Sequence, residues 1–142
     1  MLLPALLVLG ACTTATGAMV TQQRATAHVQ PPLRERVLAN AVRILQRDGW
    51  VLETQDLSAG SVTTQTMDTG TLTCGSTLCN SRSSLQIAVS EAGDVSVMLH
   101  REFYNPPPGP GWFTPGLDHD VHTIEREQQK LLQAILDLKE SP

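Results

Sequence analysis

Residues 84–100 read SLQIAVSEAGDVSVMLH, and this stretch decides the fold. Leu85, Ile87 and Val89 alternate with polar or small residues before the turn at 91–94. Val95, Val97 and Leu99 repeat the same alternation after that turn. A period of two puts the apolar side chains of a strand on one face. The stretch therefore predicts an antiparallel hairpin with one buried face and one face in water.

Helical patterns flank this hairpin on both sides along the chain. Over residues 32–48, apolar side chains recur every three or four positions, and Gly49 suits the left-handed residue that ends a helix. Residues 119–139 show the same spacing, with acidic residues near the start. The chain therefore contains two amphipathic helices, each with one face available for a sheet.

Further strands are expected at residues 50–55 and 61–74, the second with a bulge or break at Gly70. A chain of 142 residues allows one modest domain, which we expect over residues 31–142. The fold class that this pattern favours is α+β, with helices and sheet in two layers. In it, a small antiparallel sheet of three to four strands is packed by an N-terminal and a C-terminal amphipathic helix.

The start of the chain is an aliphatic run, Leu2–Leu9, followed by Gly10, Ala11 and Cys12. An apolar run that ends in small residues is typical of an export signal. The four residues Leu9-Gly10-Ala11-Cys12 resemble the lipobox of bacterial lipoproteins. Residues 1–11 are therefore expected to be a lipoprotein signal peptide. Residues 12–30, rich in Thr, Ala and Gln, are expected to be the lipidated cysteine and a flexible tether, with a short strand around Val20 as the alternative.

This resemblance implies that Cys12 carries a diacylglyceryl group and that cleavage follows Ala11. Thr13 after the cysteine implies the outer membrane, facing the periplasm, rather than the inner membrane. Two or more acyl chains are a sufficient membrane anchor. With Cys12 acylated, Cys74 and Cys79 remain as a pair in an oxidising compartment. We expect them to form a disulfide that staples a hairpin.

The run Asp118-His119-Asp120-Val121-His122 has two interpretations. In the first, an Asp caps the start of the helix and both histidines are solvated. In the alternative, Asp118, His119 and His122 lie within one helical turn of each other and bind a divalent metal ion.

Residues 105–116 read NPPPGPGWFTPG and are expected to form neither a helix nor a central strand. Trp112 and Phe113 in this Pro-rich loop either fold back over the sheet or contact a protein or glycan partner. A stiff loop loses little entropy on binding.

Charge and motifs exclude several function classes. Ten Lys and Arg residues against fourteen Asp and Glu give a net charge of −4, which argues against nucleic acid as a partner. The chain has no G-x-S-x-G, S-x-x-K or H-E-x-x-H motif, and it implies no cofactor.

Across residues 32–139, the order helix, strands, helix is similar to small envelope-assembly modules such as that of the outer-membrane assembly lipoprotein C. The resemblance implies a non-catalytic accessory or scaffolding role that binds protein partners. The alternative is a periplasmic metal-binding protein or metal-dependent enzyme that uses the histidine run.

Overall fold

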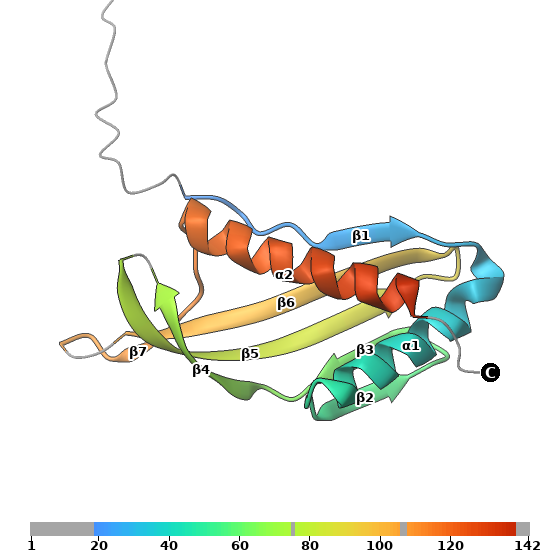
Figure 1. Ribbon diagram of the computed structural model, residues 1–142, viewed down its shortest axis with the longest axis horizontal. Coiled ribbons are helices and arrows are strands. Elements are labelled where there is room, and N and C mark those ends of the chain that lie inside the picture. Colours follow the sequence, from blue (N-terminus) through green and yellow to red (C-terminus); the bar gives the residue numbers. More distant parts are fainter. Residues whose placement is uncertain (1–18, 75, 106–107, 139–142) are drawn as a thin grey trace, which may run out of the picture.

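The computed structural model describes residues 19–74, 76–105 and 108–138. Figure 1 shows an elongated molecule in which two helices lie along a twisted sheet. In chain order, the elements are β1 (Ala25–His28), the 3-10 helix η1 (Pro31–Leu33), α1 (Arg34–Arg47), β2 (Leu52–Asp56), β3 (Ser61–Thr64), β4 (Met67–Cys74), β5 (Thr77–Val89), β6 (Asp94–Asn105), β7 (Gly111–Phe113) and α2 (Asp118–Asp137).

The long hairpin of β5 and β6 forms the centre of the sheet. Its register pairs Leu85 with Leu99 and Ile87 with Val97, so the apolar side chains of both strands share one face. Gly93 closes the turn with φ +93°, and a Cβ there would collide with the carbonyl oxygen of Val29. The hairpin predicted from residues 84–100 is therefore confirmed, and both strands run further than the alternation indicated.

Within the described residues the sheet has seven antiparallel strands, in the order β1-β6-β5-β3-β2, with β4 also on β5 and β7 also on β6. The predicted sheet of three to four strands between two terminal helices is therefore wrong. Each of the two central strands, β5 and β6, is long enough to pair with two shorter strands, one after the other, along its outer edge. β3 pairs with residues 86–88 of β5 and β4 with residues 77–83. β1 and β7 divide β6 in the same way.

The Thr-rich stretch 61–74 forms two strands instead of one. The chain leaves β3 after Thr64 and enters β4 at Met67, so each strand meets a different part of β5. Within β4 the register shifts between Asp68 and Gly70, and Gly70 has φ +79°. The bulge expected at Gly70 is present, but the division into two strands lies nearer the start of the stretch.

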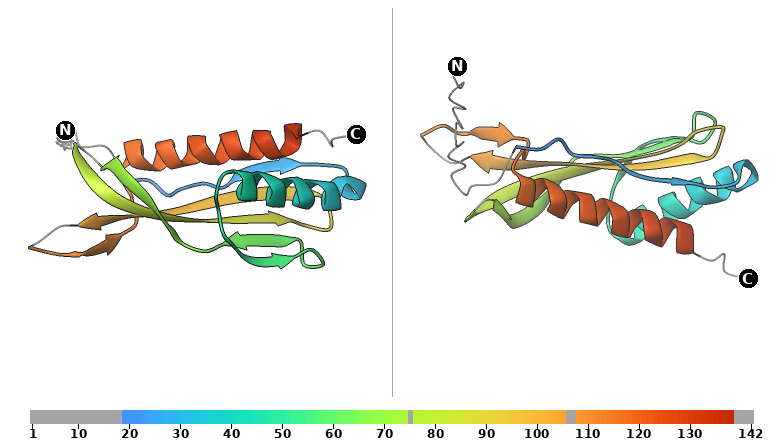
Figure 2. Two further views of the ribbon diagram at one scale, coloured as in Figure 1. Left: turned by 60° about the horizontal axis from the view of Figure 1, so that its bottom comes forward. Right: turned by 90° about the horizontal axis from the view of Figure 1, so that it is seen from above.

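Both helices lie on the same face of the sheet (Figure 2). The helix predicted over 32–48 is present as α1, and Gly49 follows its end with φ +89°. The helix predicted over 119–139 is present as α2. Helix and sheet side chains together form one buried core, whose fully enclosed members include Leu38, Ile44, Leu45, Val62, Ile87, Val97, Ile124 and Ile135.

Residues 19–30, which were expected to belong to a flexible tether, are part of the folded domain. Ala25–His28 forms β1, which pairs with residues 94–97 of β6. Before it, the Val20 N–H donates to the Gly116 carbonyl oxygen over 2.8 Å, and Met19 forms a β-bridge with Leu117. The chain is therefore part of the domain from Met19 onward. The expected signal peptide and Cys12 lie outside the described residues.

Among the helices of the described ranges, none is both long enough and apolar enough to cross a bilayer.

Candidate binding surface

The face of the sheet opposite α1 and α2 is not covered by either helix (Figure 2). Strand alternation decides which side chains it carries. Every second residue of β5 and β6 packs toward the helices, and the residues between them are exposed or half-buried. We call this surface the open face, and its central members are Thr26, Thr63, Ser84, Gln86, Ala88, Ser96, Met98 and His100. Most of these side chains are small or polar, so this part of the face is accessible to water.

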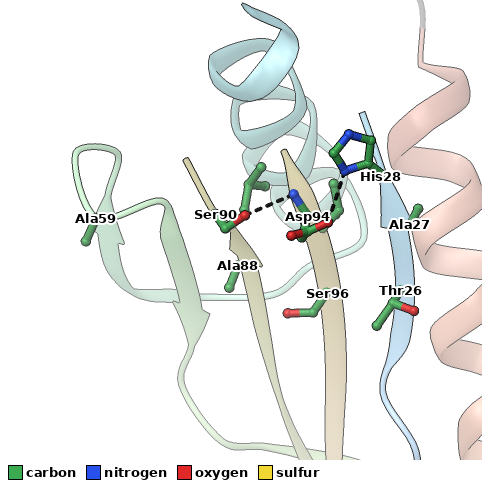
Figure 3. Close-up of a pocket in the computed structure, with 10 residues that line it drawn as sticks. Thr26, Ala27, His28, Ala59, Ala88, Ser90, Asp94 and Ser96 are labelled. Atoms are coloured by element: carbon green, nitrogen blue, oxygen red, sulfur yellow. Dashed lines mark hydrogen bonds and ion pairs between the residues drawn. The ribbon is translucent and has the colours of Figure 1, made fainter. Parts of the chain in front are cut away.

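A hollow of about 590 Å³ lies at the end of the sheet beside the β5–β6 turn. Figure 3 shows Thr26, Ala88 and Ser96 lining it, with His28 and Asp94 at its edge. His28 Nδ1 lies 3.0 Å from Asp94 Oδ1, and both side chains are more than half exposed. A solvated pair of this kind contributes little to stability.

Ser90, His28 and Asp94 are the residue types of a nucleophilic triad and lie near one another in this hollow. Their hydrogen bonds follow another pattern, because the Ser90 hydroxyl oxygen accepts the backbone N–H of Asp94 over 3.0 Å. A triad needs the hydroxyl to donate to the imidazole. Here the serine instead closes the turn between β5 and β6.

Aromatic and charged side chains gather at the other end of the open face. The register places Tyr104 beside Trp112 and Arg82 beside Glu102. The ring centroids of Tyr104 and Trp112 are 5.2 Å apart in an edge-on arrangement. Arg82 Cζ lies 4.1 Å from the Trp112 ring centroid, and Arg82 Nε donates to Glu102 Oε1 over 3.0 Å. We call Arg82, Glu102, Tyr104 and Trp112 the Trp112 cluster.

The edge-on contact with Tyr104 and the Arg82 guanidinium, which is itself paired with Glu102, hold the Trp112 indole while leaving it 38% exposed. Tryptophan, tyrosine and arginine are the residues that contribute most often to binding energy at protein interfaces. A cation over an aromatic face adds a further attraction. The cluster therefore offers a rigid contact of the type that a protein partner buries.

Trp112 and Phe113, expected to act together, lie on opposite faces of the sheet. Phe113 pairs with Phe103, whose side chain is buried on the helix-covered face, and the two ring centroids are 6.0 Å apart. Only Trp112 belongs to the open face. Residues 111–113 form the short strand β7. It lies at an edge of the sheet, in agreement with the expectation that this loop contains no central strand.

Both histidines of the run are exposed, as the first interpretation predicted, but the capping aspartate of that interpretation is not observed. The N-cap of α2 is Leu117 and no side chain caps it, so the predicted capping Asp is wrong. Asp118 Oδ1 instead lies 2.7 Å from His122 Nε2. On its other side, His122 Nδ1 lies 2.7 Å from Glu125 Oε1. Carboxylates only accept hydrogen bonds, so both contacts favour the protonated imidazole.

These contacts shift the pKa values of His122 and Glu125. The hydrogen bond to Glu125, assisted by the nearby Asp118 carboxylate, raises the pKa of His122 above its ordinary value. The Gln23 backbone N–H and then His122 lower the pKa of Glu125. His119 lies elsewhere, in a cleft lined by Leu72 and Thr73. In the described part of the chain no three His, Cys, Asp or Glu residues are grouped as a metal site requires.

Cys74 and Cys79 lie on the paired strands β4 and β5. Their Cα atoms are 5.8 Å apart and their sulfur atoms are within bonding distance. Separations of this size are usual for disulfides. The hairpin that they join ends at the same end of the sheet as β7, because residues 81–83 of β5 pair with residues 101–103 of β6, next to the residues of β6 that pair with β7.

Several polar side chains are buried that had not been identified from the sequence, and Gln128 and Arg101 are two of them. Gln128 is 1% exposed. Its Oε1 accepts the Leu99 N–H over 2.9 Å and the Gln22 amide over 2.7 Å, and its Nε2 donates to the Gln23 carbonyl oxygen over 2.7 Å. The sequence did indicate that Gln128 would be buried, because it lies four residues after Ile124 on the apolar face of the helix.

Arg101 is the second of these buried polar groups and is 8% exposed. Its Nε donates to the Ser83 hydroxyl over 3.1 Å and its Nη1 to Glu127 Oε2 over 2.5 Å. It occupies the buried position that follows Leu99 in the alternation of β6. The ion pair joins α2 to the sheet and satisfies a charge that burial would otherwise penalise.

No family model matches this chain, and no curated protein matches it in sequence. Solved structures do resemble it. A TBP-like protein from Parabacteroides distasonis is similar at 7% identity and a TM-score of 0.54, covering 82% of this chain and 93% of that one. A DUF4468 family protein from Bacteroides ovatus is similar at 11% identity and a TM-score of 0.43, covering 91% and 95%. At 7% identity, the similarity to the TBP-like protein concerns the fold alone.

Proposed function

We propose that this chain is a lipid-anchored protein of the bacterial cell envelope that binds a protein partner through the open face of its sheet. It acts as an accessory or scaffolding module without catalysis of its own. The observation that carries the proposal is the Trp112 cluster, an ordered aromatic and cationic group on a sheet face that neither helix covers.

The anchor part of the proposal rests on Leu9-Gly10-Ala11-Cys12 and the aliphatic run before it. A diacylglyceryl group on Cys12 would hold the domain at the membrane surface, at the outer membrane facing the periplasm. A pair of cysteines at bonding distance suits this oxidising compartment.

The binding part rests on the chemistry of the open face. Its centre carries mostly small or polar side chains, which can form the weaker polar contacts of an interface. The Trp112 cluster supplies one anchoring contact at the end of that surface. A central aromatic or arginine contact surrounded by weaker polar ones is the usual distribution of energy in protein interfaces.

Site-specific photocrosslinking in cells tests the binding part. A photoreactive residue in place of His100, which is exposed on the open face, should crosslink one envelope protein. The same residue in place of Gln133, which is exposed on α2, is the matched control and should not. Crosslinking from Gln133 with none from His100 would move the interface to the helices and overturn the proposal.

The crosslinked protein, once identified and purified, permits a titration. Trp112→Ala should weaken its binding about 30-fold, because truncating a tryptophan that anchors an interface costs about 2 kcal/mol. Leu57→Ala removes an exposed apolar side chain in the β2–β3 turn and should leave the Kd unchanged.

A further inference from the structure

Three exposed apolar side chains lie at one end of the molecule. β5 begins at Thr77 and β6 ends at Asn105, and because the strands are antiparallel these ends lie together. β7 pairs with the last residues of β6, and Met19 forms its bridge with Leu117 just before α2. Met19, Leu78 and Phe113 are therefore carried to the same end of the sheet, as Figures 1 and 2 show for their elements. We call these three residues the apolar tip.

The apolar tip is unusually exposed. Met19 is 74% exposed and Leu78 is 73% exposed, the two highest values among the large hydrophobic side chains described. Phe113 is 38% exposed on the side of the sheet opposite Trp112. Leu78 and Phe113 lie on opposite faces of the sheet, because Leu78 alternates with the buried Cys79 and Phe113 pairs with the buried Phe103. They are therefore separate exposed groups at one end of the molecule, and a broad surface such as a membrane would meet them together. Leu33, Val51 and Leu57, which are also exposed, lie in η1, just before β2 and in the β2–β3 turn.

The hairpin that presents Leu78 is held by covalent and backbone bonds. Leu78 directly precedes Cys79 and pairs with Thr73, which directly precedes Cys74. The cysteine pair therefore encloses the turn and keeps Leu78 extended into solvent.

The position of Met19 identifies the occupant of this surface. Cys12 and Met19 are seven residues apart, so their Cα atoms are separated by at most about 25 Å. Met19 is fixed to the domain through the bridge to Leu117 and the Val20 hydrogen bond to Gly116. Acyl chains on Cys12 would therefore keep this end of the molecule close to the bilayer.

We propose that the apolar tip rests on the bilayer in which Cys12 is anchored. This inference rests on the lipid anchor of the proposed function. Leu78, Phe113 and Met19 enter the interface between headgroups and acyl chains. The net charge of −4 gives no attraction to anionic lipids, so the contact is apolar and insensitive to salt.

Fluorescence quenching by lipids with brominated acyl chains tests this contact. Trp50 and Trp112, the two tryptophans of the chain, are replaced by phenylalanine. A single tryptophan is then introduced by Leu78→Trp. The matched control is Leu57→Trp, because Leu57 is also an exposed leucine in a turn between strands but lies near the β5–β6 turn, at the opposite end of the sheet.

The chain from residue 12 onward, which contains every described element, is coupled through the Cys12 thiol to a maleimide-bearing phospholipid in phosphatidylcholine vesicles. This coupling supplies the anchor whether or not cells acylate Cys12. Loss of Leu78→Trp fluorescence on brominated lipids, equal at low and high salt and absent for Leu57→Trp, is the expected result. Phe113→Trp in the same background provides a second reporter if Leu78→Trp disturbs the fold.

Unquenched fluorescence from both tip reporters in the folded, coupled protein would overturn the membrane contact and leave the tip to a protein partner. Equal quenching of the tip and of Leu57→Trp would overturn it as well, because the domain would then have no preferred end toward the lipid. A native protein without acyl groups would instead contradict the anchor of the proposed function, which the coupled experiment does not use.

Discussion

At the scale of single residues, two side chains of α2 hold the segment that leads from Met19 into β1. Gln128 binds the Gln22 side chain and the Gln23 carbonyl oxygen, and it also satisfies the Leu99 N–H of the sheet. Glu125 accepts the Gln23 N–H over 2.8 Å and binds His122. A buried amide with three partners is expensive to lose, whereas the exposed acid and histidine respond to pH.

Gln128→Ala should lower the free energy of unfolding by about 2–3 kcal/mol, because the buried Leu99 N–H loses its acceptor and a cavity forms. Urea denaturation measures the loss. Gln133→Ala, on the exposed side of the same helix, is the control and should change the stability by no more than about 0.5 kcal/mol. Equal losses in the two variants would mean that Gln128 does not hold the N-terminal segment.

His122 should titrate above the ordinary histidine pKa, since Glu125 and Asp118 stabilise its charged form. A raised pKa in the folded state means that the stabilisation is present below the ordinary value and is lost as the pH rises through the raised one. Glu125 has the opposite sign, because its lowered pKa gives stabilisation that is lost as the pH falls through the lowered value. The contact is therefore complete between these two pKa values.

NMR titration of the His122 ring protons measures this shift. Glu125→Gln removes the carboxylate and should bring the pKa of His122 back toward the ordinary value. His119 in the same helix serves as the internal reference for the effect of the substitution. A His122 pKa that is unchanged in Glu125→Gln would contradict the assigned contact.

At the scale of elements, regular apolar spacing made α1, α2 and the β5–β6 turn predictable from the sequence. The first half of β5 was not predictable, because its buried positions are Cys79, Ser81 and Ser83 and no run of large apolar residues alternates there. The Ser81 hydroxyl lies 2.7 Å from the Thr69 hydroxyl, and Ser83 accepts from Arg101. β1 and β7 are too short to show alternation, so their existence depends on the length of β6.

The β4–β5 hairpin leads to a prediction at the same scale. Non-reducing mass spectrometry of exported protein should find Cys74 linked to Cys79. Replacing both cysteines by serine should lower the free energy of unfolding by about 2 kcal/mol, as the chain-entropy estimate gives for so short a loop. Cys12→Ser, which leaves the pair intact, is the control and should unfold like the parent chain. Free thiols at both positions would contradict the staple.

At the scale of the whole molecule, the two faces of the sheet have different surroundings. One face packs α1 and α2 into the core, and the other remains open with the Trp112 cluster at its end. The alternation in residues 84–100 predicted that one face would be wet. The cluster could not be predicted, because it depends on the pairing of β7 with β6, which brings Trp112 beside Tyr104 and over Arg82.

The anchor at Cys12 is the central claim, because the compartment, the oxidised cysteine pair and the contact of the apolar tip all follow from it. Intact-mass and peptide mass spectrometry of the protein, purified from cell membranes with detergent, measures it most directly. The account predicts a mature chain that begins at Cys12 and carries a diacylglyceryl group on its sulfur, absent in Cys12→Ser, which leaves the membrane fraction. A native chain that retains residues 1–11 and has no acyl mass on Cys12 would contradict it.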